Sequence, residues 1–381
     1  MSDRAVKPVL HLVPRLYPAI DGIGDYALNL ARNLRSLCGI PGAFLIGDPS
    51  WEGPARFDGF ELAKLNDRSS EELRTQISRL DPERLILHYV TYGFHRRGVP
   101  FWVNQAIRRW KGEKAGRTLV IVFHELWSSG PPWRSEFYLG WIQRRLVREL
   151  QQLADGSLTS TPLMLRQLNS IVSGKTAFAP IPSCTPTSVK VDKLQPKPGV
   201  VAAIFGQEAS RFHSTKTHLS LLSGLYRAGL LEEVRCIGKG ARSGQDPSAD
   251  LKLVSASLPG AKITAHPDVS PERLSELLSG SDLALSYYPS AYVCKSSALT
   301  AAMACGCLPV LPELDNAEPL TPGHNVVGCS GTAETVEEIV RLVKSGAVAD
   351  MGRNARLWYE TNASWDVTTR AVSKMLKVSH G

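Results

Sequence analysis

The stretch PVLHLVPRLYPAIDGIGDYALNLA, residues 8–31, decides the fold class of this chain. Its apolar run Val9–Val13 is short and ends at Pro14, as expected of a buried strand and not of a membrane segment or a signal peptide. Two glycines, Gly22 and Gly24, follow, and helical spacing then extends over Asp25–Leu37. A strand, a glycine turn and a helix in this order are the first half of a βαβ unit.

The alternation of apolar strands and helical patterns continues along the chain. It predicts strands at Val9–Val13, Gly42–Ile46, Arg84–His88, Thr118–Phe123, Gly156–Thr159, Val200–Phe205, Glu233–Ile237, Ala261–Ala265, Leu283–Tyr287 and Leu308–Leu311. The predicted helices are Asp25–Leu37, Ser70–Leu80, Phe101–Trp110, Glu136–Leu153, Thr217–Ala228, Ser248–Leu258, Pro271–Leu278, Ser296–Ala304 and Ala333–Ser345. Such alternation is typical of parallel sheets with helices on both faces.

The pattern breaks down in the proline-rich stretch between Ala179 and Pro198, which we interpret as a linker. A chain of 381 residues is also long for a single core. We therefore expect an α/β protein with two Rossmann-like, doubly wound domains, residues 1–185 and 199–354. Ligands of such folds bind at the carboxyl ends of the strands, so we expect the two domains to face each other across a ligand cleft.

The composition argues against several classes of protein. No run approaches the ~20 apolar residues that a bilayer requires. The seven cysteines form neither a disulfide framework nor a metal-ligand spacing. His124-Glu125 lacks the second histidine of a zincin helix, because Ser128 stands at that position. We expect a cytoplasmic protein with no metal site.

The net charge of +8 is confined to the first half of the chain. Residues 1–190 carry 25 Lys and Arg against 17 Asp and Glu, whereas residues 191–381 carry 19 of each. Basic residues cluster at 96–97, 108–117 and 144–148, in the region that also holds five of the eight tryptophans. This mixture suits an anionic membrane surface or a phosphorylated acceptor, and equally a solvated basic face with buried tryptophans. Nucleic acid is not expected as a partner, because no module that reads it accompanies the charge.

The glycine pair favours a ligand with phosphate groups. Gly22 and Gly24 allow the backbone a tight turn and a close approach to a ligand, and the following helix presents free N–H groups there. A plain strand-to-helix turn explains the same residues. Asp25, beside the pair, is one candidate for a catalytic base.

The string Asp21-Gly22-Ile23-Gly24-Asp25-Tyr26 resembles the N-terminal glycine loop of the family 4 glycosyltransferases and their GT-B relatives. Ala302-Met303-Ala304-Cys305-Gly306-Cys307-Leu308-Pro309-Val310 resembles that family's donor-site helix and strand. Ile204-Phe205-Gly206 and Ile237-Gly238-Lys239-Gly240 are weaker matches, and Ser364-Trp365 is similar to the motif before the family's last helix. The resemblance spans nearly the whole chain. It implies a GT-B fold, a nucleotide-sugar donor, and a C-terminal segment, residues 355–381, that crosses back to the first domain.

The donor loop departs from the family pattern. The family's two glutamates would fall at Val293 and Ala301, which have no polar side chain to bind a ribose or a sugar. Lys295, Ser296 and Ser297 offer a positive charge, two hydroxyls and free backbone N–H groups that can bind a diphosphate. A serine N-cap beside a solvent-facing lysine is the structural alternative.

The family's basic pair in the second domain is also altered. Gln207 stands where the resemblance predicts an arginine, so Arg211, from the loop expected over Glu208–Thr215, is a candidate substitute. Lys216 fits the family's lysine and is the leading candidate in this domain. Such cations neutralise the charge of a departing nucleoside diphosphate without a metal.

The first domain supplies the other catalytic candidates. His124 follows the strand Thr118–Phe123 and is predicted at its carboxyl end, where it can act as a base or bind the sugar. Glu125 orients it or acts alone. A structural histidine explains the same position, although the family often places a histidine at this turn.

These features predict a metal-independent glycosyltransferase of hexosyltransferase type, with no cofactor besides the nucleotide sugar as co-substrate. The expected acceptor is lipid-linked, a polysaccharide or another glycan, and the basic first domain suggests peripheral contact with the inner face of an anionic membrane. A catalytically silent GT-B-like scaffold and a nucleotide-sugar epimerase are the alternatives. Whether transfer retains or inverts the anomeric configuration stays open.

Overall fold

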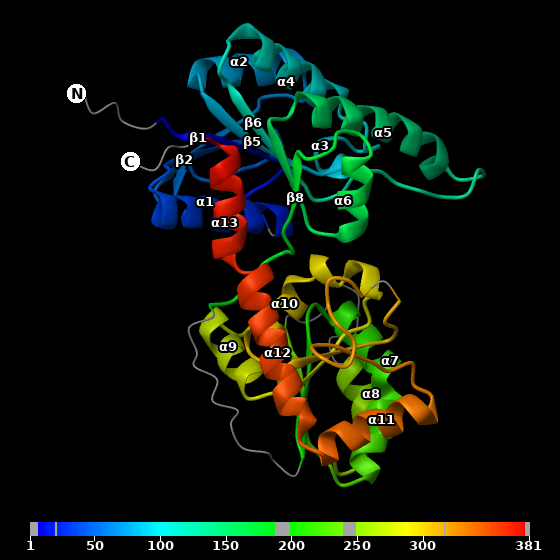
Figure 1. Cartoon of the computed structure of the whole chain (residues 1–381). Coiled ribbons are helices and arrows are strands. Elements are labelled where there is room, and N and C mark those ends of the chain that lie inside the picture. Colours follow the sequence, from blue (N-terminus) through cyan, green and yellow to red (C-terminus); the bar gives the residue numbers. More distant parts are fainter. Residues whose placement is uncertain (1–6, 20, 187–198, 239–248, 316, 378–381) are drawn as a thin grey trace. The chain divides into compact units, whose positions relative to one another are not determined.

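A computed structural model of the chain describes residues 7–19, 21–186, 199–238, 249–315 and 317–377. The chain divides into two compact units (Figure 1). The first comprises Met1–Ala179 and Trp365–Gly381, and the second comprises Pro180–Ser364. Residues 355–364 belong to the second unit, and residues from Trp365 onward belong to the first.

The first unit is built around an eight-stranded sheet of order β3-β4-β2-β1-β5-β6-β7-β8. All neighbouring strands pair in parallel except β3 and β4. The strands are β1 (Val9–Val13), β2 (Gly42–Ile46), β3 (Arg56–Phe57), β4 (Phe60–Lys64), β5 (Arg84–Tyr89), β6 (Thr118–Phe123), β7 (Gly156–Thr159) and β8 (Thr176–Phe178). Strand order reverses between β1 and β5, because β2 lies on one side of β1 and β5 on the other. Ligands of doubly wound sheets bind at such a reversal.

The helices of the first unit are α1 (Gly22–Cys38), α2 (Ser70–Leu80), α3 (Thr91–Phe94), α4 (Phe101–Glu113), α5 (Ser135–Leu153), α6 (Pro162–Asn169) and α13 (Trp365–Met375). Strands β1, β5 and β6 are buried along nearly their whole length, as apolar strands covered on both faces must be. The C-terminal α13 lies beside α1 (Figure 1). Its Trp365 contacts the Tyr26 ring of α1 at 5.3 Å between centroids.

The predicted glycine turn is the first turn of a helix. Helix α1 begins at Gly22, three residues before the predicted start, because Asp21 caps it: the Asp21 carboxylate accepts a hydrogen bond from the Ile23 N–H at 3.2 Å. Gly24 lies against the chain that leaves β1, and a Cβ there would lie 2.6 Å from the Arg15 carbonyl oxygen. Gly24 thus allows close packing of the helix, whereas Gly22 has no such neighbour.

The second unit holds a six-stranded parallel sheet of order β11-β10-β9-β12-β13-β14, with its reversal between β9 and β12. The strands are β9 (Val200–Phe205), β10 (Leu231–Ile237), β11 (Ile263–His266), β12 (Leu283–Leu285), β13 (Leu308–Leu311) and β14 (Val327–Gly328). The helices are α7 (Glu208–Arg227), α8 (Ala249–Ser257), α9 (Pro271–Ser279), the 3-10 helix η1 (Ser290–Lys295), α10 (Ser297–Ala304), α11 (Ala333–Lys344) and α12 (Ala347–Asn362).

The loop predicted over Glu208–Thr215 is wrong, because these residues form the first half of α7. The helix bends at His218, whose backbone is not helical and whose Nε2 lies 2.9 Å from the Ser286 carbonyl oxygen. The first residues of α7 are mostly polar, so the sequence pattern there did not indicate a helix. Strand β12 also ends two residues earlier than predicted.

Some predicted features fall outside the described residues, namely residues 187–198 of the linker and Lys239-Gly240 of the second glycine motif. Within the described residues, no helix combines the length and the apolar character needed to span a membrane. The same residues contain no group of three His, Cys, Asp or Glu side chains arranged to hold a metal ion.

Candidate functional site

A cavity of about 500 Å³ lies in the second unit at the carboxyl ends of its strands. Phe205 ends β9 and Gly206 follows it, Gly238 follows β10, and Tyr288 follows β12; all four line the cavity. The cavity therefore lies at the β9–β12 reversal, where doubly wound sheets bind ligands.

The start of α10 supplies the cationic wall of the cavity. Lys295, Ser296, Ser297 and Ala298 all line it. The Ser296 hydroxyl accepts the Leu299 N–H at 3.2 Å and so caps the helix, as the structural alternative predicted. The N–H groups of the first helical turn and the helix dipole still favour an anion beside Lys295.

The positions where the family resemblance expects glutamates are part of the core. Val293 is 2% exposed and Ala301 is fully buried. Neither residue lines the cavity. Among the described residues that line the cavity, Asp268, which follows β11, carries the carboxylate.

Arg211 is buried and hydrogen-bonded to other residues of the second unit. Its Nε donates to the Asp250 carboxylate at 2.7 Å, and its Nη1 donates to the carbonyl oxygens of Gly206 and Gly238 at 3.0 and 3.1 Å. Gly238 has a φ of 123°, and a Cβ there would lie 2.2 Å from the Gly206 carbonyl oxygen. Arg211 thus holds together the two glycine turns that line the cavity.

The remaining candidate of this unit, Lys216, is exposed on α7 and does not line the cavity. Its role in donor binding stays a prediction. Sequence reasoning missed Tyr288 and Asp268 as lining residues. Both follow a strand of the sheet, and that position is the signal that would have found them.

In the first unit, His124 joins two other histidines in a buried row. His11 Nδ1 lies 3.2 Å from His88 Nε2, and His88 Nδ1 lies 3.4 Å from His124 Nε2. The three residues come from β1, β5 and the end of β6, which are adjacent in the sheet. The Tyr26 ring packs edge-on against His88 and His124.

Burial keeps His11 and His88 of this row neutral. His11 and His88 are fully buried, and His124 is 7% exposed. Burial lowers the pKa of His11 to about 3. Burial also lowers the pKa of His88 well below its usual value, with smaller contributions from His11 and His124. An unprotonated imidazole can give or accept a hydrogen bond at its remaining nitrogen, but it carries no charge to offer an anion.

The structure places the other first-unit candidates near the start of α1 and the end of β6. Asp25 is exposed in the first turn of α1, and Glu125 is exposed beside His124. His88 Nδ1, 3.4 Å from His124 Nε2, is in place to orient the His124 ring.

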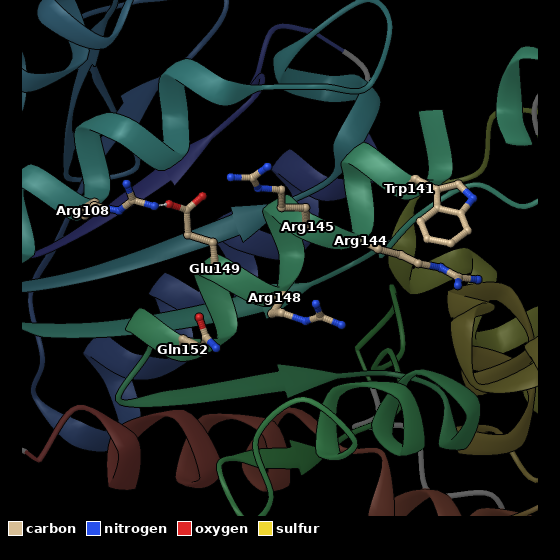
Figure 2. A pocket seen from close by; sticks show the side chains of 7 residues that line it. All are labelled: Arg108, Trp141, Arg144, Arg145, Arg148, Glu149 and Gln152. Atoms are coloured by element: carbon tan, nitrogen blue, oxygen red, sulfur yellow. Dashed lines mark ion pairs between the residues drawn. The ribbon is translucent and has the colours of Figure 1, made fainter. Parts of the chain in front are cut away.

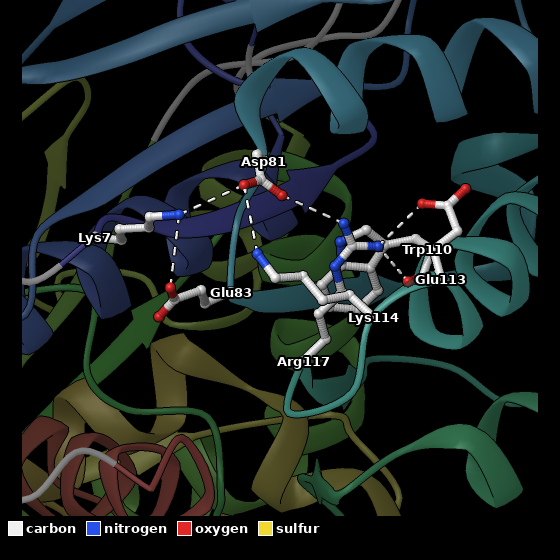
Figure 3. Close-up of polar contacts among 7 residues, drawn as sticks. All are labelled: Lys7, Asp81, Glu83, Trp110, Glu113, Lys114 and Arg117. Atoms are coloured by element: carbon white, nitrogen blue, oxygen red, sulfur yellow. Dashed lines mark hydrogen bonds and ion pairs between the residues drawn. The ribbon is translucent and has the colours of Figure 1, made fainter.

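The densest basic group of the sequence, residues 108–117, is neutralised internally. Figure 3 shows part of this network: Asp81 pairs with Lys7, Lys114 and Arg117, and Glu113 also pairs with Arg117. Lys114 and then Lys7 hold the pKa of the Asp81 carboxyl below its usual value. The other members pair with acidic residues too: Arg108 with Glu149, Arg109 with Glu71, and Lys111 with Asp155. This group therefore offers little charge to a membrane or a ligand.

The arginines of α5 behave differently. A hollow of about 590 Å³ is lined by Arg108 of α4 and by Trp141, Arg144, Arg145, Arg148, Glu149 and Gln152 of α5 (Figure 2). The Arg144 guanidinium lies over the Trp127 ring at 5.1 Å. No carboxylate in the described ranges pairs with Arg144, Arg145 or Arg148. Trp141 is 68% exposed and Tyr138 is 65% exposed on the same helix.

Two Rossmann-like units, each with a strand reversal, define the GT-B fold, and solved glycosyltransferases share it. A glycosyltransferase from Rickettsia africae is 13% identical, with a TM-score of 0.65 over 98% of this chain and 100% of that one. WaaG, a glycosyltransferase of lipopolysaccharide biosynthesis, is 12% identical, with a TM-score of 0.62 over 97% and 100%. The lipopolysaccharide outer core galactosyltransferase WaaB is 13% identical, with a TM-score of 0.60 over 97% and 99%. No protein-family model matches the chain, and no curated protein matches its sequence. The predicted α/β fold with two Rossmann-like domains is confirmed.

Proposed function

We propose that this protein is a glycosyltransferase that transfers a sugar, of hexosyl type, from a nucleotide-sugar donor to a glycan, polysaccharide or lipid-linked acceptor. The observation that carries the proposal is the cavity at the β9–β12 reversal, with Lys295 and the start of α10 on its wall. The GT-B fold shared with glycosyltransferases of lipopolysaccharide synthesis supports it.

The donor diphosphate is proposed to lie beside Lys295, Ser297 and the first N–H groups of α10. Each charge-assisted hydrogen bond there contributes about 1.5–3 kcal/mol. When the bond to the sugar breaks, negative charge builds up on the departing diphosphate, and fixed positive groups stabilise it without reorganisation. No metal and no further cofactor is included in this proposal.

The other lining residues suit the nucleoside. Phe205 and Tyr288 present aromatic surface to a base, and the Asp268 carboxylate can accept hydrogen bonds from ribose hydroxyls. Lys216 is proposed as an accessory cation for the donor. In the first unit, His124, Asp25 and Glu125 remain the proposed catalytic residues. Gly22 and Gly24 shape the start of α1 beside Asp25.

The acceptor side is proposed to contact the cytoplasmic face of an anionic membrane. Tyr138, Trp141, Arg145 and Arg148 are exposed on α5 at spacings of three, four and three residues, which place them along one face of the helix. Exposed aromatic rings enter the headgroup region and arginines bind lipid phosphates, as in interfacial helices. The chain is accordingly proposed to work as a cytoplasmic, peripherally attached enzyme.

Turnover tests this function. The protein is incubated with UDP-, GDP-, ADP- and CMP-sugars, and the free nucleotide is measured. A transferase releases free nucleotide from its donor by slow hydrolysis, and faster when a suitable acceptor is added. Binding without any release would identify a scaffold, and an altered sugar nucleotide without an acceptor would identify an epimerase. Either result contradicts the proposal.

A further inference from the structure

The chain leaves the second sheet directly after β12, beside the cavity. The ladder of β12 with β13 ends at Leu285, and the Ser286 N–H still donates to the Val310 carbonyl oxygen at 3.1 Å. In this parallel register, the next N–H that β13 would offer to the Ser286 carbonyl belongs to Pro312, which has none. The main chain that follows β12 therefore needs partners from outside the sheet.

Helix α7 supplies these partners. The His218 Nε2 lies 2.9 Å from the Ser286 carbonyl oxygen, and the Tyr287 N–H donates to the Ser214 hydroxyl oxygen at 3.1 Å. A carbonyl oxygen only accepts, so His218 Nε2 carries the proton and donates it. His218 and Ser214 are four residues apart and both are buried, which places them on one face of the helix.

The bend of α7 falls at the residue that makes the first of these contacts. The His218 backbone has a φ of −103° and a ψ of 15°, which interrupts the helix. Burial lowers the pKa of the His218 imidazole, and the hydrogen bond to Ser286 offsets only part of this effect. The neutral ring has its one N–H on Nε2. Its buried Nδ1, which has no hydrogen-bond partner among the described residues, is then a bare acceptor, and no donor is left unpaired.

Tyr288, the next residue of the segment, lines the cavity. Its N–H donates to the Ser286 hydroxyl oxygen at 3.3 Å, and its ring stacks on the Tyr287 ring with centroids 4.6 Å apart. Ser210, one turn before Ser214 on α7, lines the same cavity. A shift of the main chain at residues 286–287 would therefore move the aromatic surface proposed for the base.

We infer that His218 and Ser214 are positioning residues of the donor site, which hold the chain after β12 so that the Tyr288 ring can pack against the nucleobase of the donor. The inference rests on the proposed function, because it assigns both residues to the nucleoside half of a nucleotide sugar. Neither residue is among the described ones that line the cavity, so both act through Tyr288. The diphosphate half, beside Lys295, is held by another element, the start of α10.

Calorimetric titration with UDP, GDP and ADP, and with inorganic pyrophosphate, separates the two halves of the donor. Ser214→Ala and His218→Leu should each weaken binding of the preferred nucleoside diphosphate about fivefold and leave the affinity for pyrophosphate unchanged. His218→Gln keeps a side-chain N–H for the same carbonyl and should bind as the wild type does. Ser220→Ala removes an exposed hydroxyl from α7 and is the matched control.

A double variant tests whether the effect passes through Tyr288. Tyr288→Ala should weaken nucleoside diphosphate binding about tenfold, as the loss of base stacking does. Adding Ser214→Ala to it should cost little more, because both changes remove the same contact. Additive losses would show that Ser214 acts by another route and would overturn the inference, as would equal losses for pyrophosphate and the nucleoside diphosphate in Ser214→Ala.

The Tyr288 ring also reports on its position without a ligand. In NMR spectra of the full chain labelled with ¹³C-tyrosine, the Tyr288 signals should shift in Ser214→Ala and in His218→Leu but not in Ser220→Ala. Unchanged Tyr288 signals in Ser214→Ala would contradict the inference even if His218→Leu does not fold. If no nucleoside diphosphate binds, the proposed donor site fails, while the Tyr288 signals still decide whether α7 positions this residue.

Discussion

Arg211 and Asp250 form a buried ion pair, 2.7 Å from Nε to Oδ2, with side chains 5% and 0% exposed. The same guanidinium binds the carbonyl oxygens of the glycine turns after β9 and β10. The pair therefore connects the stability of the second unit to the shape of its cavity.

Asp250→Asn should be strongly destabilising, because it leaves the Arg211 charge buried without its counter-charge. Breaking a buried pair on one side costs about 3–5 kcal/mol. Denaturant unfolding measures the loss. Glu276→Gln, which breaks the exposed pair with Arg273, is the matched control and should cost less than about 1 kcal/mol. Equal losses in the two variants would contradict the structural role of Arg211.

Lys295→Ala should weaken the binding of nucleoside diphosphates about tenfold or more, since it removes a charge-assisted hydrogen bond of about 1.5–3 kcal/mol. Lys216→Ala removes the same charge from an exposed position outside the cavity lining and should weaken binding less. Calorimetric titration with UDP, GDP and ADP compares the two variants. A larger loss in Lys216→Ala would place the diphosphate elsewhere.

Acid should destabilise the first unit through its buried histidines. The unfolded chain binds a proton at His11 near pH 6.5, whereas the folded chain does so only near pH 3. The contribution of His11 to the free energy of unfolding is therefore fully present above pH 6.5 and is lost as the pH drops from 6.5 toward 3. His11 alone accounts for a loss of about 2 kcal/mol at pH 5, and His88 acts in the same direction.

The unfolding free energy of the wild type and His11→Phe, measured at pH 7 and pH 5, checks this prediction. His11→Phe should lose less stability between the two pH values than the wild type. The exposed His213→Gln serves as the control and should follow the wild type. An identical pH dependence in the wild type and His11→Phe would refute the prediction.

Removing two arginines from α5 should weaken attachment to anionic vesicles. Arg145→Gln with Arg148→Gln takes two unpaired charges off the exposed face, at about 1 kcal/mol per charge near the surface. Cosedimentation with phosphatidylserine vesicles measures the effect. Arg79→Gln with Arg370→Gln removes equal charge from α2 and α13 and should bind nearly as the wild type does. Similar losses in both double variants would show that net charge alone causes attachment.

The strands were predictable because buried parallel strands are continuous apolar runs. Val9–Val13, Gly42–Ile46 and Thr118–Phe123 have the predicted bounds. Strand β3 was missed because it has only two residues, and β4 was missed because it carries the charged Glu61 and Lys64. The start of α7 was missed because a polar segment with an arginine is typical of a loop, and the buried pairing of Arg211 with Asp250 cannot be read from the sequence.

The candidate site was only partly predictable. Lys295, Ser296 and Ser297 line one cavity at the start of a helix, which is where the sequence placed them. The histidine row depends on the relative register of three strands, with 77 residues between His11 and His88 and 36 between His88 and His124. No local pattern carries that information. The internal pairing of residues 108–117 likewise depends on acidic partners distant in the sequence, such as Asp81 and Glu149.

A crystal structure of the protein with the nucleoside diphosphate that binds most tightly tests the central claim most directly. The account predicts the diphosphate in the cavity of the second unit, within hydrogen-bond distance of Lys295 Nζ and the first N–H groups of α10. A diphosphate bound elsewhere on the chain, with Lys295 not in contact, would contradict the proposed donor site.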